Sequence, residues 1–276
     1  MPEIIYNYFE NIIGVPKFTA EEYMPKNSKY CICIPIINEG SRIHRELERA
    51  KKNGVHELCD IIICDGGSTD GCTDHEVLKK LGVNTLLTKK DIGKQGAQLR
   101  MGFWWALDRG YEGVVTVDGN DKDSIEDVLR FIEKLEQGYD FIQGSRYVPG
   151  GKAVNTPLLR HLSVKFMHAP IISLTAKHRF TDTTNAFRGH SRRYLVHKEV
   201  QPFRDIFMTY ELLAYLSVRA SQLGMKVCEV PVTRAYPKGE EVPTKISLVK
   251  GNGNLLKILF LNIYGYYQPP KSKENF

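Results

Sequence analysis

Carboxylate, amide and guanidinium side chains that could bind a polar ligand recur directly after apolar, β-branched runs of this 276-residue sequence. Four such segments stand out: PIINEG at 35–40, DGGSTDG at 65–71, DGNDKD at 118–123 and GSRY at 144–147. In open α/β sheets ligands bind outside the carboxyl ends of the strands, so these segments could meet at one edge of a sheet. Each segment alone is also a good turn former or helix cap. Their convergence is what favours a binding site.

The motifs of several common enzyme classes do not occur in the sequence. Gly93-Lys-Gln-Gly96 lacks the GxGxxG spacing after the first predicted strand, and no GxxxxGK[ST] segment is present. GxSxG and HExxH are also absent. The sequence therefore supports neither a dinucleotide oxidoreductase nor a P-loop nucleotidase, and the hydrolases and zinc enzymes that carry those motifs are excluded as well.

Strand-like and helix-like segments alternate over most of the chain and would position these residues. Helical spacing of Ile5, Phe9 and Ile12 predicts an amphipathic helix over residues 3–13, followed by a polar linker at 16–29. The other predicted strands are 30–37, 58–64, 83–87, 113–117, 140–143 and 226–232, and the helices are 41–52, 74–81, 95–108, 124–136, 158–174, 209–223 and 255–264. This alternation indicates βαβ units in a single α/β domain, with a mixed, mainly parallel sheet flanked by helices.

Charge and cysteine content restrict the class of protein further. The 38 Lys and Arg residues against 32 Asp and Glu give a net charge of +6, which suits phosphate-bearing ligands or an anionic membrane surface. The basic clusters at 177–179 and 188–193 lack interleaved aromatic residues, so we interpret them as solvated faces and expect no nucleic-acid partner. The six cysteines form no CxxC pair and are expected to be reduced core thiols.

No targeting or membrane-spanning segment is expected. The N-terminal residues carry two glutamates and no basic residue before Lys17, unlike the basic start of a signal peptide. The apolar stretch at 255–267 is shorter than the roughly 18 residues of a membrane span and is interrupted by Lys257 and Asn262. We therefore expect a cytoplasmic protein, with peripheral contact at the cytoplasmic membrane face as the closest approach to a bilayer.

Residues 29–257 resemble a family 2 glycosyltransferase of the GT-A (Rossmann-like) fold, nearest to the polyprenyl-phosphate and dolichyl-phosphate mannose or glucose synthases. The resemblance rests on eight segments in the family's order: IPIINEG, CDGGSTDG, GKQGAQLRMGFWWA, VDGND, QGSRYVPGG, DTTNAFR, YELLAYLSVRASQLGMKVCEVPV and YPKGEEVPTKIS. It implies an inverting transfer of a sugar from a nucleoside diphosphate to a polyprenyl phosphate, or to a lipid-linked or surface glycan. The chain then divides into an N-terminal helix and linker (1–28), a domain with a nucleotide-binding half (29–145) and an acceptor half (146–257), and a C-terminal helix and tail (258–276).

The resemblance also implies which residues hold the nucleotide sugar. These residues are Pro35, Asn38, Glu39, Asp65, Ser68, Lys94, Asp118, Lys122 and Lys245. Pro35, Asn38 and Glu39 with Asp65 should hold the base and ribose. Lys94 should lie beside them, and Asp118 should lie at the donor diphosphate. Lys245 belongs to a late basic loop, with Lys238, that resembles the loop closing on the diphosphate in relatives. UDP is the expected nucleotide, ahead of GDP and dTDP.

A divalent metal is expected at the diphosphate, because charge grows on the leaving phosphates and Mg²⁺ or Mn²⁺ held by oxygen ligands usually stabilises it. The family's acidic DxD appears here as Asp118-Gly119-Asn120, so the candidate ligands are Asp118 and Asn120. An amide oxygen can bind the metal but brings no charge, which predicts a weakened or dispensable site. Lys122, where related synthases usually carry a neutral amide, could supply positive charge itself. The alternative is that Lys122 is a solvated loop residue and Asp121 binds the metal.

The second half of the chain offers residues for the acceptor. Arg146 could grip a phosphate through two parallel hydrogen bonds, and Asp182 and Asn185 are the other acceptor-binding candidates. A sugar hydroxyl needs a general base, for which Glu211 is the candidate, whereas a lipid phosphate is already ionised. The expected catalytic residues are therefore Asp118, Glu211 and Arg146, although Glu211 also fits an ordinary acid in the first turn of a helix. A non-catalytic nucleotide-sugar-binding protein of the same fold is the alternative from another class.

Overall fold

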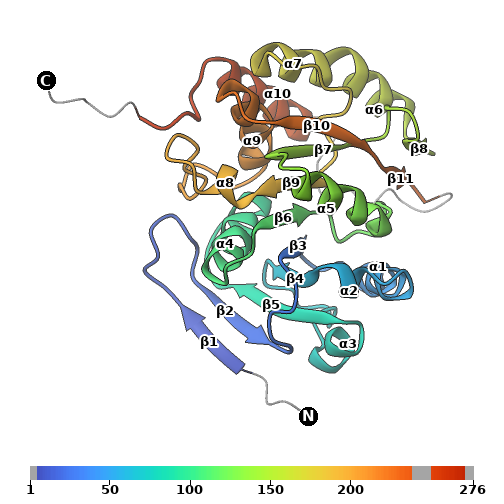
Figure 1. The fold of residues 1–276 in the computed structure, drawn as a ribbon, viewed down its shortest axis with the longest axis vertical. Helices are drawn as coiled ribbons and strands as arrows, with labels where there is room; N and C mark the ends of the chain where they lie inside the picture. The colour runs from blue at the N-terminus through green and yellow to red at the C-terminus, as the bar shows by residue number, and fades with distance from the viewer. Residues whose placement is uncertain (1–4, 238–249, 271–276) are drawn as a thin grey trace, which may run out of the picture.

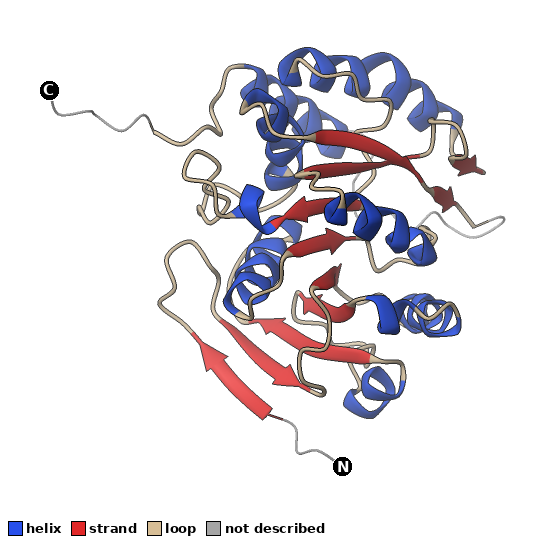
Figure 2. Cartoon of the chain, in the orientation of Figure 1, coloured by secondary structure: helices blue, strands red, loops and turns tan. Residues whose placement is uncertain are grey.

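The computed structural model describes residues 5–237 and 250–270, and a nine-stranded sheet runs through the described part. Figure 2 shows this sheet with helices on both of its faces. The strand order is β1-β2-β5-β4-β3-β6-β9-β7-β10. The bounds are β1 (Ile5–Phe9), β2 (Phe18–Glu22), β3 (Tyr30–Ile36), β4 (Asp60–Asp65), β5 (Val83–Lys89), β6 (Gly113–Thr116), β7 (Phe141–Ser145), β9 (Arg188–Ser191) and β10 (Val227–Pro231).

Strand direction confirms the mixed, mainly parallel sheet. β3 pairs in parallel with both β4 and β6, β4 with β5, and β7 with β10. β2 and β9 run antiparallel to their neighbours. Because β4, β3 and β6 are adjacent and parallel, the loops that follow them meet at one edge of the sheet, as the sequence predicted.

Helices cover the two faces and divide the apolar core between them (Figure 1). On one face lie α4 (Gln95–Asp108), α7 (Ala169–Ala176), α9 (Glu211–Gln222) and α10 (Lys250–Ile263). On the other lie α1 (Ser41–Lys52), α2 (Val55–Leu58), α3 (His75–Lys80) and α5 (Val128–Glu136). α4 lies very close to the sheet, because a Cβ at Gly102 would come within 2.6 Å of Cys64 Sγ. The short helices η1 (Ile125–Asp127) and α8 (Arg192–Leu195) precede α5 and follow β9.

The second half adds a small parallel sheet and a long helical segment. β11 (Thr233–Ala235) pairs with β8 (Lys152–Val154). After β8 the chain forms α6 (Leu158–Ser163), the π-helical turn η2 (Val164–His168) and α7 without a break. In Figure 1, α6, α7 and α10 lie at the end of the molecule away from β1 and β2.

The predicted N-terminal helix over 3–13 is wrong. Residues 5–9 form β1 and part of the expected linker forms β2, and the two strands extend the sheet beyond β5. Phe9 stacks on Phe18 with ring centroids 4.9 Å apart and packs against Trp104 and Trp105 of α4. From Tyr6 to Phe9 exposed and half-buried residues alternate, so a period of two prevailed over the helical spacing.

The other predicted elements are present, most within two residues of their expected bounds, and the helix expected at 255–264 begins earlier, at Lys250. β9 is the main element that the sequence did not predict, since RGHS is polar although the strand lies inside the sheet. All six cysteines are free thiols, and five of them are buried, as expected.

Candidate active site

The loops after β3 and β4 bind each other through side chains. The Asn38 backbone N–H donates to Ser68 Oγ over 2.9 Å, and the Thr69 backbone N–H donates to Asn38 Oδ1 over 2.8 Å. The Gly40 N–H donates to Asp70 Oδ2 over 2.7 Å. Asn38 adopts a positive φ of 49°, and its two hydrogen bonds to the loop after β4 hold this conformation in place. Pro35 is the penultimate residue of β3, and Glu39 is buried and paired with Arg42 over 3.0 Å.

Asp65 organises the loop that follows β4. Its two carboxylate oxygens accept hydrogen bonds from the Gly67 N–H, the Ser68 N–H and Ser68 Oγ, the last over 2.6 Å. The residue is almost completely buried. Asp65 therefore fixes the shape of the loop at the sheet edge, and Ser68 joins this loop to the one after β3.

The N-terminus of α4 closes the next side of the edge. Lys94 is the exposed residue preceding the helix, and its N–H donates to the Met208 carbonyl over 2.8 Å. Gln95 Nε2 donates to Asp118 Oδ1 over 2.8 Å, which ties α4 to the loop after β6. Gly96 allows the close approach, because a Cβ there would lie 2.7 Å from the Phe207 carbonyl oxygen.

The loop at 118–123 is held by β11 and by a buried arginine. The Ala235 N–H donates to the Lys122 carbonyl over 2.7 Å. Arg234 forms ion pairs with Asp118, over 3.3 Å, and with Asp123. Burial raises the pKa of Asp123 to about 6, and it likewise lowers the pKa of Lys122, with the positive charge of Arg234 adding to that effect. Lys122 is thus a buried cation beside Asp118 and not the solvated loop residue of the alternative.

Several cations surround the ring of Tyr236. Lys122 Nζ lies 5.3 Å from the ring centroid, and the guanidinium carbons of Arg160 and Arg234 lie 5.8 and 5.9 Å from it. Arg160 Nη1 also donates to the Tyr236 hydroxyl over 3.1 Å. Burial acts to raise the pKa of this phenol, but the neighbouring arginines outweigh it and leave the pKa below its ordinary value. The lowered pKa indicates a strongly positive electrostatic potential at the Tyr236 hydroxyl.

The loop at 118–123 does not provide a carboxylate-rich metal site. Asp118 already accepts hydrogen bonds from Gln95 and Arg234, while Asn120 Oδ1 is buried without a hydrogen-bond partner in the structure. Asp121 points to α1, where it pairs with two arginines, so the alternative in which it binds the metal has no support. No group of three or more His, Cys, Asp or Glu side chains within 5–237 and 250–270 could hold a metal ion. Metal binding by Asp118 and Asn120 stays a prediction.

Arg146 and Asp182 form a buried pair. Arg146 Nε donates to Asp182 Oδ2 over 2.6 Å and Nη2 donates to Oδ1 over 2.9 Å, which is the two-bond geometry expected with a phosphate. The guanidinium holds the pKa of Asp182 below its usual range against the effect of burial. Asn185 is fully buried and its Oδ1 accepts from the Phe187 N–H. None of the three is among the residues that line the pocket described next, so their expected roles in acceptor binding have no direct support.

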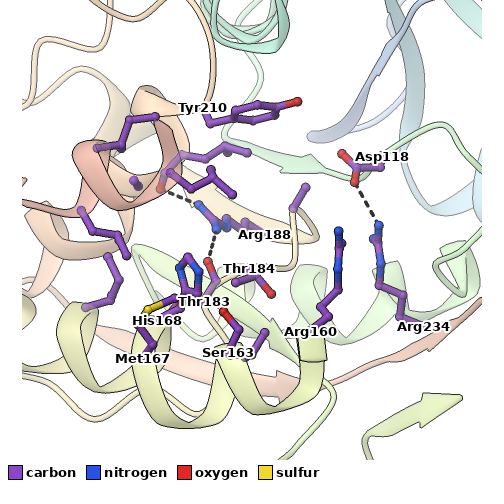
Figure 3. Close-up of a pocket in the computed structure, with 18 of the residues that line it drawn as sticks. Asp118, Arg160, Ser163, Met167, His168, Thr183, Thr184, Arg188, Tyr210 and Arg234 are labelled. Carbon is purple, nitrogen blue, oxygen red and sulfur yellow. Dashed lines mark hydrogen bonds and ion pairs between the residues drawn. The ribbon is translucent and has the colours of Figure 1, made fainter. Parts of the chain in front are cut away.

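A pocket of about 750 Å³ lies next to Asp118 and Arg234, as Figure 3 shows. Its polar lining residues also include Gln95, Arg160, Thr183, Thr184, Arg188 and Tyr210. The opposite walls are apolar and come from α6, η2, α7, α9 and α10, with Leu159, Val164, Met167, Ile172, Leu213, Leu255, Ile258 and Leu259. Arg160 and Arg234 point the same way at one end of the pocket (Figure 3).

Arg188 adds positive charge at the wall of the pocket. It is buried and donates to the carbonyls of Thr183, Leu213 and Asn185 without an ion pair among the described contacts. Burial lowers the pKa of this guanidinium to about 10, yet it stays charged at neutral pH. The interpretation of residues 188–193 as a wholly solvated face is therefore wrong at Arg188.

One expected catalytic residue, Glu211, is not among the residues that line the pocket. Glu211 begins α9, and its carboxylate accepts from the Thr209 N–H over 2.6 Å and from Thr209 Oγ1 over 2.7 Å. Its neighbour Tyr210, and not Glu211, lines the pocket. Lys238 and Lys245 lie outside the described residues.

Sequence reasoning missed the most prominent cations of the pocket. Arg160 lies among the leucines of α6, and Arg234 lies in the short run VTRAY, between two of the segments on which the family resemblance rests. A charged residue inside an apolar, strand-like run was the available signal, because such a residue is buried only with partners.

Comparisons with known proteins agree with this geometry. The model of the family described as Glycosyl transferase family 2 matches residues 31–198. An undecaprenyl-phosphate mannosyltransferase of Micrococcus luteus is 28% identical over 203 residues, covering 72% of this chain and 81% of that protein. A polyprenol monophosphomannose synthase of Mycolicibacterium smegmatis is 28% identical over 208 residues, covering 73% and 76%.

The fold also matches solved structures. The crystal structure of glucosyl-3-phosphoglycerate synthase from Mycobacterium tuberculosis with Mn²⁺, UDP and phosphoglyceric acid has a TM-score of 0.60 at 13% identity, over 88% of this chain and 80% of that one. This likeness confirms the expected GT-A fold. Because the family model covers more than half of the sequence, the chain belongs to glycosyltransferase family 2 and is an enzyme that transfers sugars.

Proposed function

We propose that this glycosyltransferase moves a sugar, with inversion, from a nucleoside diphosphate sugar to the phosphate of a polyprenyl phosphate. The observation that carries the proposal is the division of the pocket into a cationic end at the sheet edge and apolar walls beyond it. A polyprenyl phosphate has the same division, with a charged head and a long hydrocarbon chain. The names of the two relatives, which act on polyprenyl substrates, support the same acceptor class.

The cationic end suits a phosphate monoester. Arg160 and Arg234 lie at this end, and Arg188 adds a charge that no carboxylate of the described residues neutralises by direct contact. Guanidinium groups bind phosphate oxygens through paired hydrogen bonds, and burial strengthens such contacts. Arg160 is the best candidate to contact the acceptor head, because Arg234 is already paired with Asp118 and Asp123.

The apolar walls suit an isoprenoid chain. The side chains from α7 and α10 lie beyond Arg160, so a lipid whose head is bound at the arginines would place its first isoprene units against them. Burial of apolar surface stabilises such a complex by about 25 cal/mol per Å². A free sugar would leave these walls without a matching partner.

The reaction would need no general base. An oxygen of the ionised acceptor phosphate attacks the anomeric carbon, the new carbon–oxygen bond forms, and the bond from that carbon to the donor diphosphate breaks, so the diphosphate leaves with the electron pair. Glu211 is bound to Thr209 and lies outside the pocket lining, which supports a positioning role. Lys122 and Arg234 would stabilise the charge that grows on the leaving diphosphate. A divalent metal held by Asp118 and Asn120 would add to that stabilisation.

The donor would bind where the loops after β3, β4 and β6 meet. Asn38, Asp65 and Ser68 are held together there, with Lys94 and Asp118 on the next side. UDP is our first choice of nucleotide, ahead of GDP and dTDP. Lys245 of the late basic loop is proposed to close on the diphosphate.

The test is a transfer assay with UDP-, GDP- and dTDP-sugars against a short-chain polyprenyl phosphate and the matching polyprenol. We expect product only with the phosphate. Arg160→Gln should raise the KM for the acceptor at least tenfold while donor affinity is kept, and Arg130→Gln on α5 serves as a matched surface control.

Two results would contradict the proposal. Transfer to a sugar hydroxyl, with Glu211→Gln slowing turnover by roughly 10²–10⁴-fold, would assign Glu211 as a general base and a glycan as the acceptor. Binding of a nucleotide sugar without turnover on any acceptor would favour the non-catalytic alternative.

A further inference from the structure

The outer face of the helical segment 158–176 is apolar although it faces solvent. Leu158, Phe166 and Leu174 are 71%, 69% and 80% exposed, and Leu159 and Leu162 are exposed beside them. The buried residues Val164, His168, Ile172 and Ala176 of the same segment recur at intervals of four, and Ala169 is buried beside them. One stripe therefore faces the core while the opposite stripe presents large apolar side chains to water.

The second helix at this end shows the same feature. On α10 and just after it, Phe260, Ile263, Tyr264 and Tyr266 are exposed. α10 packs against α7, and both lie at the end of the molecule away from β1 (Figure 1). We call the exposed apolar residues of 158–174 and 260–266 the apolar end surface. Large exposed apolar side chains on two helices that pack together are unusual on a soluble protein and mark an interaction site.

The two segments that carry the apolar end surface have charged residues of one sign only. Residues 141–181 contain no Asp or Glu, and neither do residues 242–273. The basic residues in the first stretch are Arg146, Lys152, Arg160, Lys165, Lys177 and Arg179. Lys165 and Lys177 are exposed among the apolar side chains of the first helix, and Lys257 is exposed on α10. A protein partner usually presents charges of both signs, whereas an anionic bilayer presents negative charge alone. An anionic bilayer therefore matches a surface whose charged residues are all basic.

We propose that the apolar end surface docks the protein on an anionic lipid bilayer, with the apolar side chains in the interface and the lysines at the headgroups. Amphipathic helices with apolar and basic residues bind membranes in this way, and each Lys or Arg near an anionic surface adds to the attraction. Within the described ranges no helix combines the length and apolar character needed to cross a bilayer. The docking would be interfacial.

Docking would also place the pocket at the membrane. The pocket lies between α6–α7 and α10, which are the helices that carry the apolar end surface, and Leu159 belongs to both. A lipid chain could then pass from the bilayer to the apolar walls while its phosphate reaches Arg160. This last step rests on the proposed function, whereas docking itself does not.

The test is sedimentation with vesicles that contain no polyprenyl phosphate and no nucleotide sugar. We expect the protein to bind phosphatidylcholine vesicles with 30 mol% phosphatidylglycerol much more tightly than pure phosphatidylcholine vesicles, and added salt should weaken binding. Phe166→Glu with Leu174→Glu should reduce binding to the anionic vesicles at least tenfold, and Lys165→Gln with Lys177→Gln severalfold. Ile5→Glu, a charge added at an exposed apolar position of β1 at the other end of the molecule (Figure 1), should leave binding unchanged.

The controls separate docking from catalysis. Transfer to a short-chain acceptor in detergent should be unaffected by the Phe166 and Leu174 substitutions, because neither residue lines the pocket. Equal vesicle binding by the wild type and this double variant would overturn the proposal. The proposal would also be overturned if the wild type were a dimer in sedimentation velocity and the double variant a monomer, because a second copy would then cover the surface. Failure of transfer with intact vesicle binding would overturn only the proposed function.

Discussion

Asp65 shows how one buried carboxylate can shape a ligand-binding loop without necessarily touching the ligand. Its oxygens accept hydrogen bonds from two backbone N–H groups, of Gly67 and Ser68, and from the Ser68 hydroxyl. Ser68 in turn binds the loop after β3. Hydrogen bonds to a charged group contribute roughly 1.5–3 kcal/mol each, so removing the carboxylate should release both loops.

Asp65→Ala should therefore weaken nucleotide binding at least tenfold and abolish the thermal shift that a nucleoside diphosphate produces. The measurement is a thermal-shift titration with UDP, GDP, CDP and dTDP. Asp74→Ala is the matched control, because Asp74 caps α3 through the Val77 N–H and its loss should cost about 1 kcal/mol of stability without affecting binding. Unchanged nucleotide affinity in a folded Asp65→Ala protein would remove Asp65 from the site.

Lys122 and Asn120 should make the protein insensitive to divalent metal. Lys122 puts a positive charge next to Asp118, and Asn120 offers an oxygen without charge, so Mn²⁺ should bind weakly. We expect EDTA to change nucleotide affinity by less than threefold, and Asn120→Asp with Lys122→Gln to bind Mn²⁺ at least tenfold more tightly than the wild type. Calorimetric titration with Mn²⁺ measures both proteins. A wild type saturated at micromolar Mn²⁺ would mean that the loop holds a metal as it stands.

The elements differ in how well the sequence predicts them, for physical reasons. α1 was predicted with its observed bounds because its apolar residues recur at helical spacing, and the loops after β3, β4 and β6 followed from strand order. α4 was also predicted with its observed bounds, although it is buried on nearly all sides. β9 was not predicted because Arg188 and His190 are buried by the strands on either side and not by their own polarity. Arg160 and Arg234 could not be assigned to the pocket, since only the tertiary fold brings α6 and β11 to the sheet edge.

At β1 a short helical pattern predicted the wrong element, and the packing of this strand on α4 can be tested. Phe9 lies against Phe18, Trp104 and Trp105, whereas Tyr8 on the alternate face of the strand is 51% exposed. Phe9→Ala should lower the free energy of unfolding by about 2 kcal/mol, less than for a fully buried phenylalanine because Phe9 is only partly buried. Tyr8→Ala is the control and should change stability little. Urea denaturation compares them, and equal effects would mean that the strand is not docked on α4.

At the scale of the whole molecule, one buried strand connects the positively charged pocket with a buried histidine. Arg188 and His190 both belong to β9, which runs between β6 and β7 at the centre of the second half. His190 lies among Phe103, Phe141 and Tyr194, and neither ring nitrogen has a hydrogen-bond partner in the structure. The sheet that positions the pocket therefore encloses an imidazole that must stay neutral.

This neutral imidazole predicts how stability depends on pH. Burial, with the nearby Arg188 charge, lowers the pKa of His190 to about 3, whereas an unfolded histidine has a pKa of about 6.5. As the pH falls below about 6.5 the unfolded chain binds a proton that the folded protein cannot, so stability is complete above that pH and is lost progressively toward pH 3. Between pH 7.5 and pH 5 the loss from this residue should be about 2 kcal/mol, since each unit below 6.5 corresponds to about 1.4 kcal/mol.

Replacing His190 should remove this part of the acid sensitivity. His190→Phe keeps an aromatic ring among its aromatic neighbours, and His190→Leu is a smaller second variant in case the phenyl ring does not fit. Urea midpoints at pH 7.5, 6 and 5 should fall steeply for the wild type and for His178→Gln, a partly exposed control, and less steeply for the His190 variants. Parallel pH profiles for the wild type and both His190 variants would mean that the folded protein can charge His190, and that β9 is open to water on the time scale of unfolding.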